Sequence, residues 1–211
     1  MTTETKLRDA LAMHGQALYQ RGLAHGSAGN MSVRLDDGIL ITPTNTCMGR
    51  LDPARIAKVS FDGRHLSGDK PSKEGFLHLA MYEERPNDTA IVHLHSTHSV
   101  ACACLDGIDE ANVLPPLTAY YVMKVGTLPL VPYFRPGDRA LADAVRHYAK
   151  QHHAMLLAHH GPVVSGKALD ATVYAMEELE ETAKLYLLLQ SHAYRTLTPE
   201  QIADLNAAFP S

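Results

Sequence analysis

The amino-acid sequence predicts an α/β sandwich in which a central, mainly antiparallel sheet is flanked by helices. Short segments with alternating apolar and polar residues are separated by turn residues, and longer segments of helical period lie between them. Hairpins with helices inserted between them favour a layered α/β architecture. The chain has 211 residues and 45% of them are hydrophobic. Residues 1–211 are therefore expected to form a single domain around one substantial core.

The N-terminal part is predicted to contain one helix followed by hairpins. Leucines recur at helical spacing within residues 3–22, and Gly22 is a suitable C-terminal cap. A tight turn at Asp36-Asp37-Gly38 is expected to join two strands. The pair Asp52-Pro53 has the residues of a helix N-cap and first helical position, which predicts a short helix. Residues 59–66 are expected to form another hairpin.

The remaining elements are predicted from changes of hydrophobic period along the chain. A helical period begins at Ser72 and continues to Glu84. A long helix is expected over residues 168–194, and the pattern from Thr198 to Gln201 is that of a capping box that opens a last short helix. The other predicted elements are strands at 90–95, 128–132 and 154–159 and a helix at about 139–150.

The composition excludes several classes of partner. There are 19 basic and 23 acidic residues, which give a net charge of -4, and no basic run could follow a phosphate backbone. Nucleic acid is therefore not an expected partner. No apolar stretch is long enough for a membrane span or has the form of a signal peptide, so we expect a cytoplasmic protein. Its three cysteines, Cys47, Cys102 and Cys104, are expected to be reduced thiols.

A candidate metal site comes from histidine spacing. His93 and His95 are two residues apart in a predicted strand, so both imidazoles project from one face, roughly 7 Å apart at the backbone. His160 follows another apolar segment, and Glu74 lies near a predicted helix start. Three imidazoles and a carboxylate suit zinc. The alternative is that each residue has an ordinary core, turn or helix-start role, because a histidine pair at this spacing often arises by chance.

The other histidines of these segments are interpreted differently. His78, His98, His152 and His153 are expected to be structural or exposed.

Five ordered motifs link the sequence to a known family. They are Gly29-Asn30-Met31-Ser32, Thr42-Pro43-Thr44, Pro71-Ser72-Lys73-Glu74, His93-Leu94-His95 and His160-Gly161-Pro162. In order and spacing they resemble the class II aldolase and adducin family, over almost the whole chain. The resemblance implies the fold of that family and a metal ion, Zn²⁺ with Mn²⁺ or Co²⁺ as alternatives. It also implies that His93, His95 and His160 bind the metal and that Glu74 is both a fourth ligand and a catalytic acid or base.

Three further segments resemble one branch of the family. They are residues 66–74, 131–138 and 176–184, and the branch comprises decarboxylases of 3-oxo-tetronate 4-phosphate. The implied reaction is a zinc-dependent loss of CO2 that yields dihydroxyacetone phosphate through a metal-bound enediolate, because a Lewis acid stabilises the charge left by the broken bond. A class II aldolase or epimerase acting on a fuculose- or ribulose-type phosphate would pass through similar chemistry and is the alternative. A non-catalytic, adducin-like interaction module is a third hypothesis.

The resemblance also implies how the substrate is bound. Asn30, Thr44 and Ser72 match the phosphate-binding positions of the family, and a glycine-lined turn beside a helix start is a suitable site for a dianion. Tyr120 matches a proton-donating tyrosine that reaches in from a neighbouring subunit, which implies a homotetramer with active sites between subunits. Tyr121 is an adjacent alternative, and either tyrosine could instead have a buried packing role.

Three positions depart from the family pattern. Asn45 replaces a glycine of the phosphate loop, and His159 next to His160 could compete for the metal or lie in its second coordination shell. Lys73 replaces a serine that sugar-phosphate aldolases use for phosphate. A cation at position 73 could bind the phosphate more strongly, or it could bind a carboxylate of the substrate. A substrate that is an acid requires binding of its carboxylate.

Overall fold

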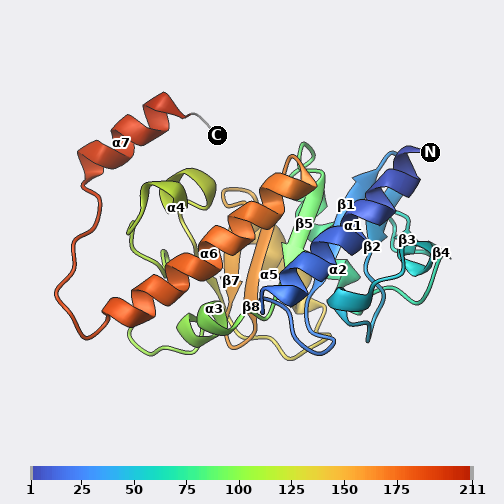
Figure 1. Ribbon diagram of the computed structural model, residues 1–211, viewed down its shortest axis with the longest axis horizontal. Helices are drawn as coiled ribbons and strands as arrows, with labels where there is room; N and C mark the ends of the chain where they lie inside the picture. The colour runs from blue at the N-terminus through green and yellow to red at the C-terminus, as the bar shows by residue number, and fades with distance from the viewer. Residues whose placement is uncertain (1, 210–211) are drawn as a thin grey trace.

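An eight-stranded sheet forms the centre of the computed structural model, which describes residues 2–209 (Figure 1). The strand order is β4-β3-β2-β1-β5-β8-β7-β6, and every pair is antiparallel except β6 and β7. This confirms the predicted, mainly antiparallel sheet. The strands are β1 (Asn30–Leu35), β2 (Gly38–Ile41), β3 (Ala57–Val59), β4 (His65–Ser67), β5 (Ala90–His93), β6 (Leu130–Val131), β7 (Ala154–Leu157) and β8 (Gly161–Gly166).

Helices cover both faces of the sheet and enclose two buried apolar clusters. One face is covered by α1 (Thr3–Gln20) and α6 (Leu169–Leu189), which lie across the front in Figure 1, together with the short helices α3 (Thr97–Cys102) and α4 (Ala119–Lys124). The other face is covered by α2 (Gly75–Glu84) and α5 (Ala140–Ala149), which pack on each other. The last helix, α7 (Pro199–Ala208), lies outside these layers and contacts α4.

The alternation of side chains along β5 determines which face carries polar groups. Ala90 and Val92 belong to the cluster beneath α1 and α6, whereas Ile91 belongs to the cluster beneath α2 and α5. Since successive strand residues point to opposite faces, His93 points toward α2. Asn30 is paired directly with His93 in the neighbouring strand β1. The sheet register thus brings polar residues of β1 and β5 beneath the start of α2.

Most predicted elements are confirmed, including their caps. Gly22 ends α1 with φ 77, and Leu23 and Gly22 donate to the carbonyls of Leu18 and Tyr19 as in a Schellman motif. The Asp52 side chain caps the one-turn 3₁₀ helix η2 (Pro53–Arg55), which follows a second 3₁₀ turn, η1 (Met48–Arg50). The predicted hairpin at 59–66 corresponds to β3 and β4, and the predicted capping box opens α7.

Several boundaries differ from the prediction, and most of the observed elements are shorter than the predicted ones. The helix predicted from Ser72 begins at Gly75, because the N–H of Ser72 pairs with the carbonyl of Thr42 and Pro71 bridges to Pro43 beside β2. The strand predicted to reach residue 95 ends at His93, and the helix predicted to reach residue 194 ends at Leu189.

Helices α3 and α4 and strand β8 were not predicted. β8 lies between β5 and β7 although its second residue is Pro162, because a proline near the first residue of a strand removes little of the hydrogen-bond ladder. The Gly161-Pro162 pair indicates a turn when the sequence is considered alone. Within residues 2–209, none of the helices is sufficiently long and apolar to span a membrane.

Candidate metal centre

Three histidines meet where two neighbouring strands adjoin. His93 is the last residue of β5 and is fully buried, and His95 lies two residues further along the chain. His160 lies in the turn between β7 and β8. Because β5 and β8 are antiparallel neighbours, the end of β5 adjoins the start of β8. The sheet topology therefore brings His160 next to the pair that the sequence spacing indicates.

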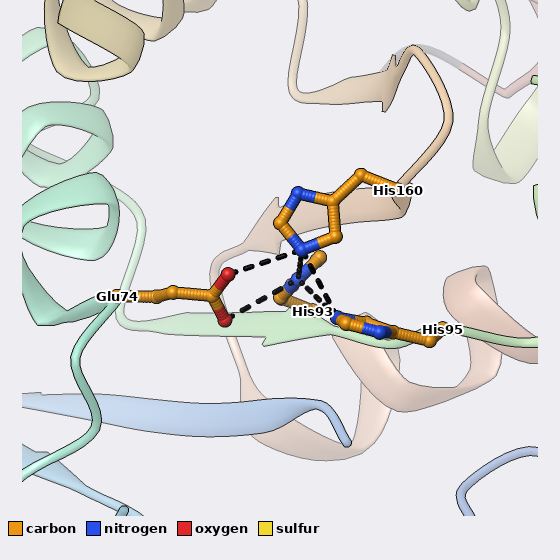
Figure 2. Close-up of side chains that lie close together, drawn as sticks. All are labelled: Glu74, His93, His95 and His160. Atoms are coloured by element: carbon orange, nitrogen blue, oxygen red, sulfur yellow. Dashed lines mark hydrogen bonds and ion pairs between the residues drawn. The ribbon is translucent and has the colours of Figure 1, made fainter. Parts of the chain in front are cut away.

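The three imidazoles direct the same ring nitrogen toward one point (Figure 2). The Nε2 atom of His93 lies 3.2 Å from that of His95 and 3.3 Å from that of His160, and the last two are 3.1 Å apart. A tetrahedral zinc ion with bonds of about 2.0–2.1 Å separates its ligand atoms by about 3.3 Å. The spacing of the three nitrogens therefore matches that of ligands on a common ion.

Glu74 completes the cluster from the opposite side. It is the N-cap of α2, and its Oε1 lies 3.0 Å from Nε2 of His160 while its Oε2 lies 3.5 Å from Nε2 of His93 (Figure 2). The four ligand atoms all lie within 4.8 Å of one another. The four residues predicted as metal ligands are thus brought together, and they form a possible metal site.

The protonation of the cluster suits a cation. Nδ1–H of His93 donates to the carbonyl of Pro162 at 2.8 Å, which leaves its Nε2 with a free lone pair. Burial, together with the neighbouring imidazoles, lowers the pKa of His95 to about 3 and also lowers the pKa of His93. Burial raises the pKa of Glu74, but His93, His160 and Asn30 outweigh it, so the net shift is downward. Neutral imidazole and ionised carboxylate are the forms that bind a divalent metal, and the lowered pKa values of His93 and His95 favour the neutral form of these two rings.

Gly161 allows the two ligand-bearing segments to approach each other. Its φ is 148, and a Cβ atom at this position would lie 2.2 Å from the carbonyl oxygen of Leu94, between His93 and His95. A side chain would therefore push the turn that carries His160 away from the end of β5.

Placing alanine in a backbone conformation that favours glycine costs about 1 kcal/mol by itself. We expect Gly161→Ala to lower the free energy of unfolding by clearly more than this amount and to weaken metal binding. Gly63→Ala is the matched control, since Gly63 also has a positive φ (85) but its Cβ would meet only the Leu79 side chain at 3.9 Å. Chemical denaturation and metal titration of both variants test this. Equal losses in the two variants would contradict the close-approach argument.

The residues predicted to bind phosphate lie on adjoining segments. The N–H of Thr44 donates to the carbonyl of Lys70, and the hydroxyl of Ser72 accepts from the N–H of Glu74. Lys73 is exposed and borders a groove of about 600 Å³ along α2 and α5. Asn30 is buried, and its Nδ2 donates to Oε2 of Glu74 at 2.7 Å. Asn30 therefore contacts a metal-ligand candidate directly.

Two of the departures from the family pattern share a backbone feature. Asn45 and His159 both have φ 56, in the left-handed region, and both are residue types that tolerate it better than most. Asn45 therefore adopts a backbone conformation that glycine also favours. The ring of His159 packs edge-on against Tyr133, with centroids 6.0 Å apart, and is not among the clustered ligands of the described residues.

The two adjacent tyrosines have different environments. Tyr120 on α4 is 62% exposed, whereas Tyr121 is 1% exposed and belongs to the apolar cluster beneath α6. Burial raises the pKa of the Tyr121 hydroxyl. Tyr121 thus has the packing role that was left open for either residue, and Tyr120 is free to meet another molecule.

The four other histidines singled out in the sequence have structural or partly exposed positions, as predicted, but one lies close to the site. His98 pairs with Glu180 at 2.8 Å, the ring of His153 contacts backbone carbonyls, and His152 is half-buried. His78 is fully buried and hydrogen-bonded to Asn30, so it is linked to Glu74. The sequence carried a signal for this link, because His78 follows Glu74 by one helical turn.

The fold and the cluster of histidines with a glutamate define a protein of the class II aldolase type. The chain belongs to this family, since residues 9–187 match the Class II Aldolase and Adducin N-terminal domain. The 3-oxo-tetronate 4-phosphate decarboxylase of Escherichia coli (strain K12) is 51% identical over 205 residues, which are 97% of each chain. L-fuculose phosphate aldolase of the same strain is 36% identical over 186 residues, 86% of this chain and 84% of that one.

A solved structure agrees with these sequence relationships. The crystal structure of YgbL from Escherichia coli, described as a candidate aldolase, epimerase or decarboxylase, superposes with a TM-score of 0.94 at 49% identity. The match covers 97% of this chain and 99% of that chain. The resemblance inferred from the motifs is confirmed at the level of the family.

Proposed function

We propose that this protein is a metal-dependent carboxy-lyase that converts 3-oxo-tetronate 4-phosphate into dihydroxyacetone phosphate and CO2. The observation that carries the proposal is the identity of about half of the residues, over nearly the full length, to relatives with that activity in their name. The clustered histidines and Glu74 support it, since the reaction needs a group that accepts negative charge.

His93, His95, His160 and Glu74 would hold the metal, which we propose to be zinc, with manganese or cobalt as alternatives. Three neutral imidazoles and one carboxylate fit zinc by donor type, and their spacing supports this. When bound, the metal would supply Lewis-acid stabilisation of the negative charge that develops on the C3 carbonyl oxygen of the substrate.

Glu74 is proposed to act as the general base and then the general acid of the reaction at C2 of the substrate. Its carboxylate is ionised, because its pKa is lowered despite burial, so it can take the proton of the C2 hydroxyl. After CO2 has left with the C1–C2 bond broken, Glu74 returns this proton to C2, and a proton from solvent restores the hydroxyl. Tyr120 of a neighbouring subunit is the alternative donor. The exposure of Tyr120 supports this arrangement. The arrangement requires an oligomer, which we propose to be a homotetramer.

The substrate's charged ends are assigned to the loops beside α2. Asn30, Thr44 and Ser72 are proposed to bind the phosphate, and Lys73 the carboxylate that leaves as CO2. Lys73 has no ion-pair partner within residues 2–209 and is therefore available to an anion.

Lys73→Ser is expected to lower kcat/KM for decarboxylation by about 10- to 100-fold, the value of a charge-assisted hydrogen bond. Its affinity for inorganic phosphate, measured as competitive inhibition, should change by less than about twofold, because the carboxylate contact is lost and the phosphate contacts remain. Lys70→Ser, three residues earlier and also exposed, is the control. An unchanged kcat/KM in Lys73→Ser would refute the carboxylate role.

The decisive assay follows CO2 and dihydroxyacetone phosphate released from 3-oxo-tetronate 4-phosphate, with and without a chelator. Fuculose 1-phosphate and ribulose 5-phosphate are the comparison substrates, since the aldolase relative supports that alternative. We expect release only from the keto acid and only with metal. Turnover of a neutral sugar phosphate alone would favour the aldolase or epimerase, and absence of both bound metal and turnover would favour the interaction module.

The chain is further proposed to act as one domain in the cytoplasm. The buried clusters involve elements from α1 to α6, and Cys47, Cys102 and Cys104 in the described part of the chain are free thiols. Both features support these proposals.

A further inference from the structure

A buried row of polar side chains runs behind the metal cluster between α2 and β1. Glu74, His78 and Tyr82 follow one another at intervals of four residues, so they line one face of the helix. Asn30 and Ser32 are two residues apart in β1 and line one face of the strand. The two faces meet, and His78 is fully buried between them.

Hydrogen bonds connect these side chains one after another, from Glu74 to Tyr82. Nδ2 of Asn30 donates to Oε2 of Glu74 at 2.7 Å, and Nε2 of His78 lies 2.5 Å from Oδ1 of Asn30. Oγ of Ser32 lies 2.7 Å from Nδ1 of His78 and 3.0 Å from the hydroxyl of Tyr82. Each side chain except Glu74 is nearly or fully buried, so water cannot replace a lost partner.

With the Asn30 amide in this orientation, only one tautomer of His78 satisfies both of its hydrogen bonds. Oδ1 of Asn30 can only accept, so Nε2 of His78 must carry the proton, and Nδ1 must then accept from the hydroxyl of Ser32. Burial lowers the pKa of His78 to about 3, which keeps the ring neutral. If the Asn30 amide were rotated by half a turn, Oδ1 would face the carboxylate of Glu74 and the two oxygens would repel each other.

We propose that His78 is a positioning residue for Glu74: together with Ser32 it holds the Asn30 amide in the orientation that donates to Glu74. His78 does not touch the metal cluster and acts through Asn30. The inference rests on the proposed function, because it concerns a carboxylate that takes part in turnover and metal binding.

The test compares two substitutions at position 78. His78→Met keeps most of the volume but removes the donor, so Asn30 is free to rotate. Loss of an outer partner of a metal site costs about 10- to 100-fold, and we expect kcat and Co²⁺ affinity each to fall by about tenfold. His78→Gln retains an amide N–H that can donate to Asn30, and both quantities should stay within about threefold of the wild type.

Thr172→Val controls for the general loss of a buried hydrogen bond. The hydroxyl of Thr172 donates to the carbonyl of Ala168 at the start of α6, away from the cluster, so this variant should lose stability without losing Co²⁺ affinity. Thermal unfolding of each metal-free variant verifies that it is folded. Equal Co²⁺ affinities in His78→Met and Thr172→Val, or equal losses in His78→Met and His78→Gln, would overturn the proposal.

The same experiment separates this inference from the proposed function. Wild-type protein is assayed in parallel with 3-oxo-tetronate 4-phosphate. If it does not release CO2, the proposed function fails, and the Co²⁺ affinities alone decide whether His78 positions Glu74.

Discussion

Replacing His93 with alanine is expected to abolish both metal binding and turnover. His93 is buried at the end of β5, and its Nε2 lies within 3.3 Å of the corresponding atoms of His95 and His160. Its loss leaves two imidazoles and a carboxylate, which hold an ion less tightly. Loss of a residue that only hydrogen-bonds to a metal ligand lowers metal affinity by about 10- to 100-fold, and the loss of affinity in His93→Ala should be larger. Elemental analysis after dialysis and the CO2 assay measure the two effects.

His65→Ala is the matched control for this prediction, because His65 lies on the exposed edge strand β4. It should retain metal and activity. A His93→Ala protein that contains no metal but turns over at the full rate would defeat the assignment of the ligands.

Glu74→Gln is expected to lose turnover while retaining much of the metal affinity. The amide cannot take up and return a proton, and general acid–base catalysis contributes about 10²- to 10⁴-fold, so kcat should fall within that range. The three imidazoles remain, and the metal affinity should fall by no more than about tenfold. Steady-state kinetics at saturating metal and a separate metal titration distinguish the two effects.

Glu83→Gln is the control for Glu74→Gln, since Glu83 lies on the same helix and pairs with Arg146 at the surface. Wild-type turnover in Glu74→Gln would remove Glu74 from the mechanism and leave it only as a metal ligand.

Local patterns predicted most elements because their causes are local. Gly22 ends α1, the capping box opens α7, and Asp52 caps the 3₁₀ turn η2. These features could be predicted because each depends on only a few neighbouring residues. The pattern failed where distant contacts override it. Ser72 pairs with Thr42 instead of joining α2, and Pro162 lies within a central strand because β5 and β7 flank it.

The sequence indicated a metal site, but it did not show which of the candidate residues come together to form it. His93 and His95 are two residues apart, and strand geometry alone indicates a shared face. Glu74 and His160 were candidates by residue type and local position, and only the resemblance to the family joined them to the histidine pair. Nothing in the separate segments shows that His159 turns to Tyr133 while His160 turns to the cluster, or that Tyr121 is buried while Tyr120 is exposed.

By itself the sequence determined the family, the layered α/β class and the kinds of ligand, because motifs and periodicity are carried by residues close together in the chain. The tertiary structure decided which atoms meet. The pairing of β1 with β5 and of β5 with β8 places Asn30 and His160 beside His93, and the packing of α2 brings in Glu74 and His78. These contacts depend on strand register and helix packing, which are set by the folded chain as a whole.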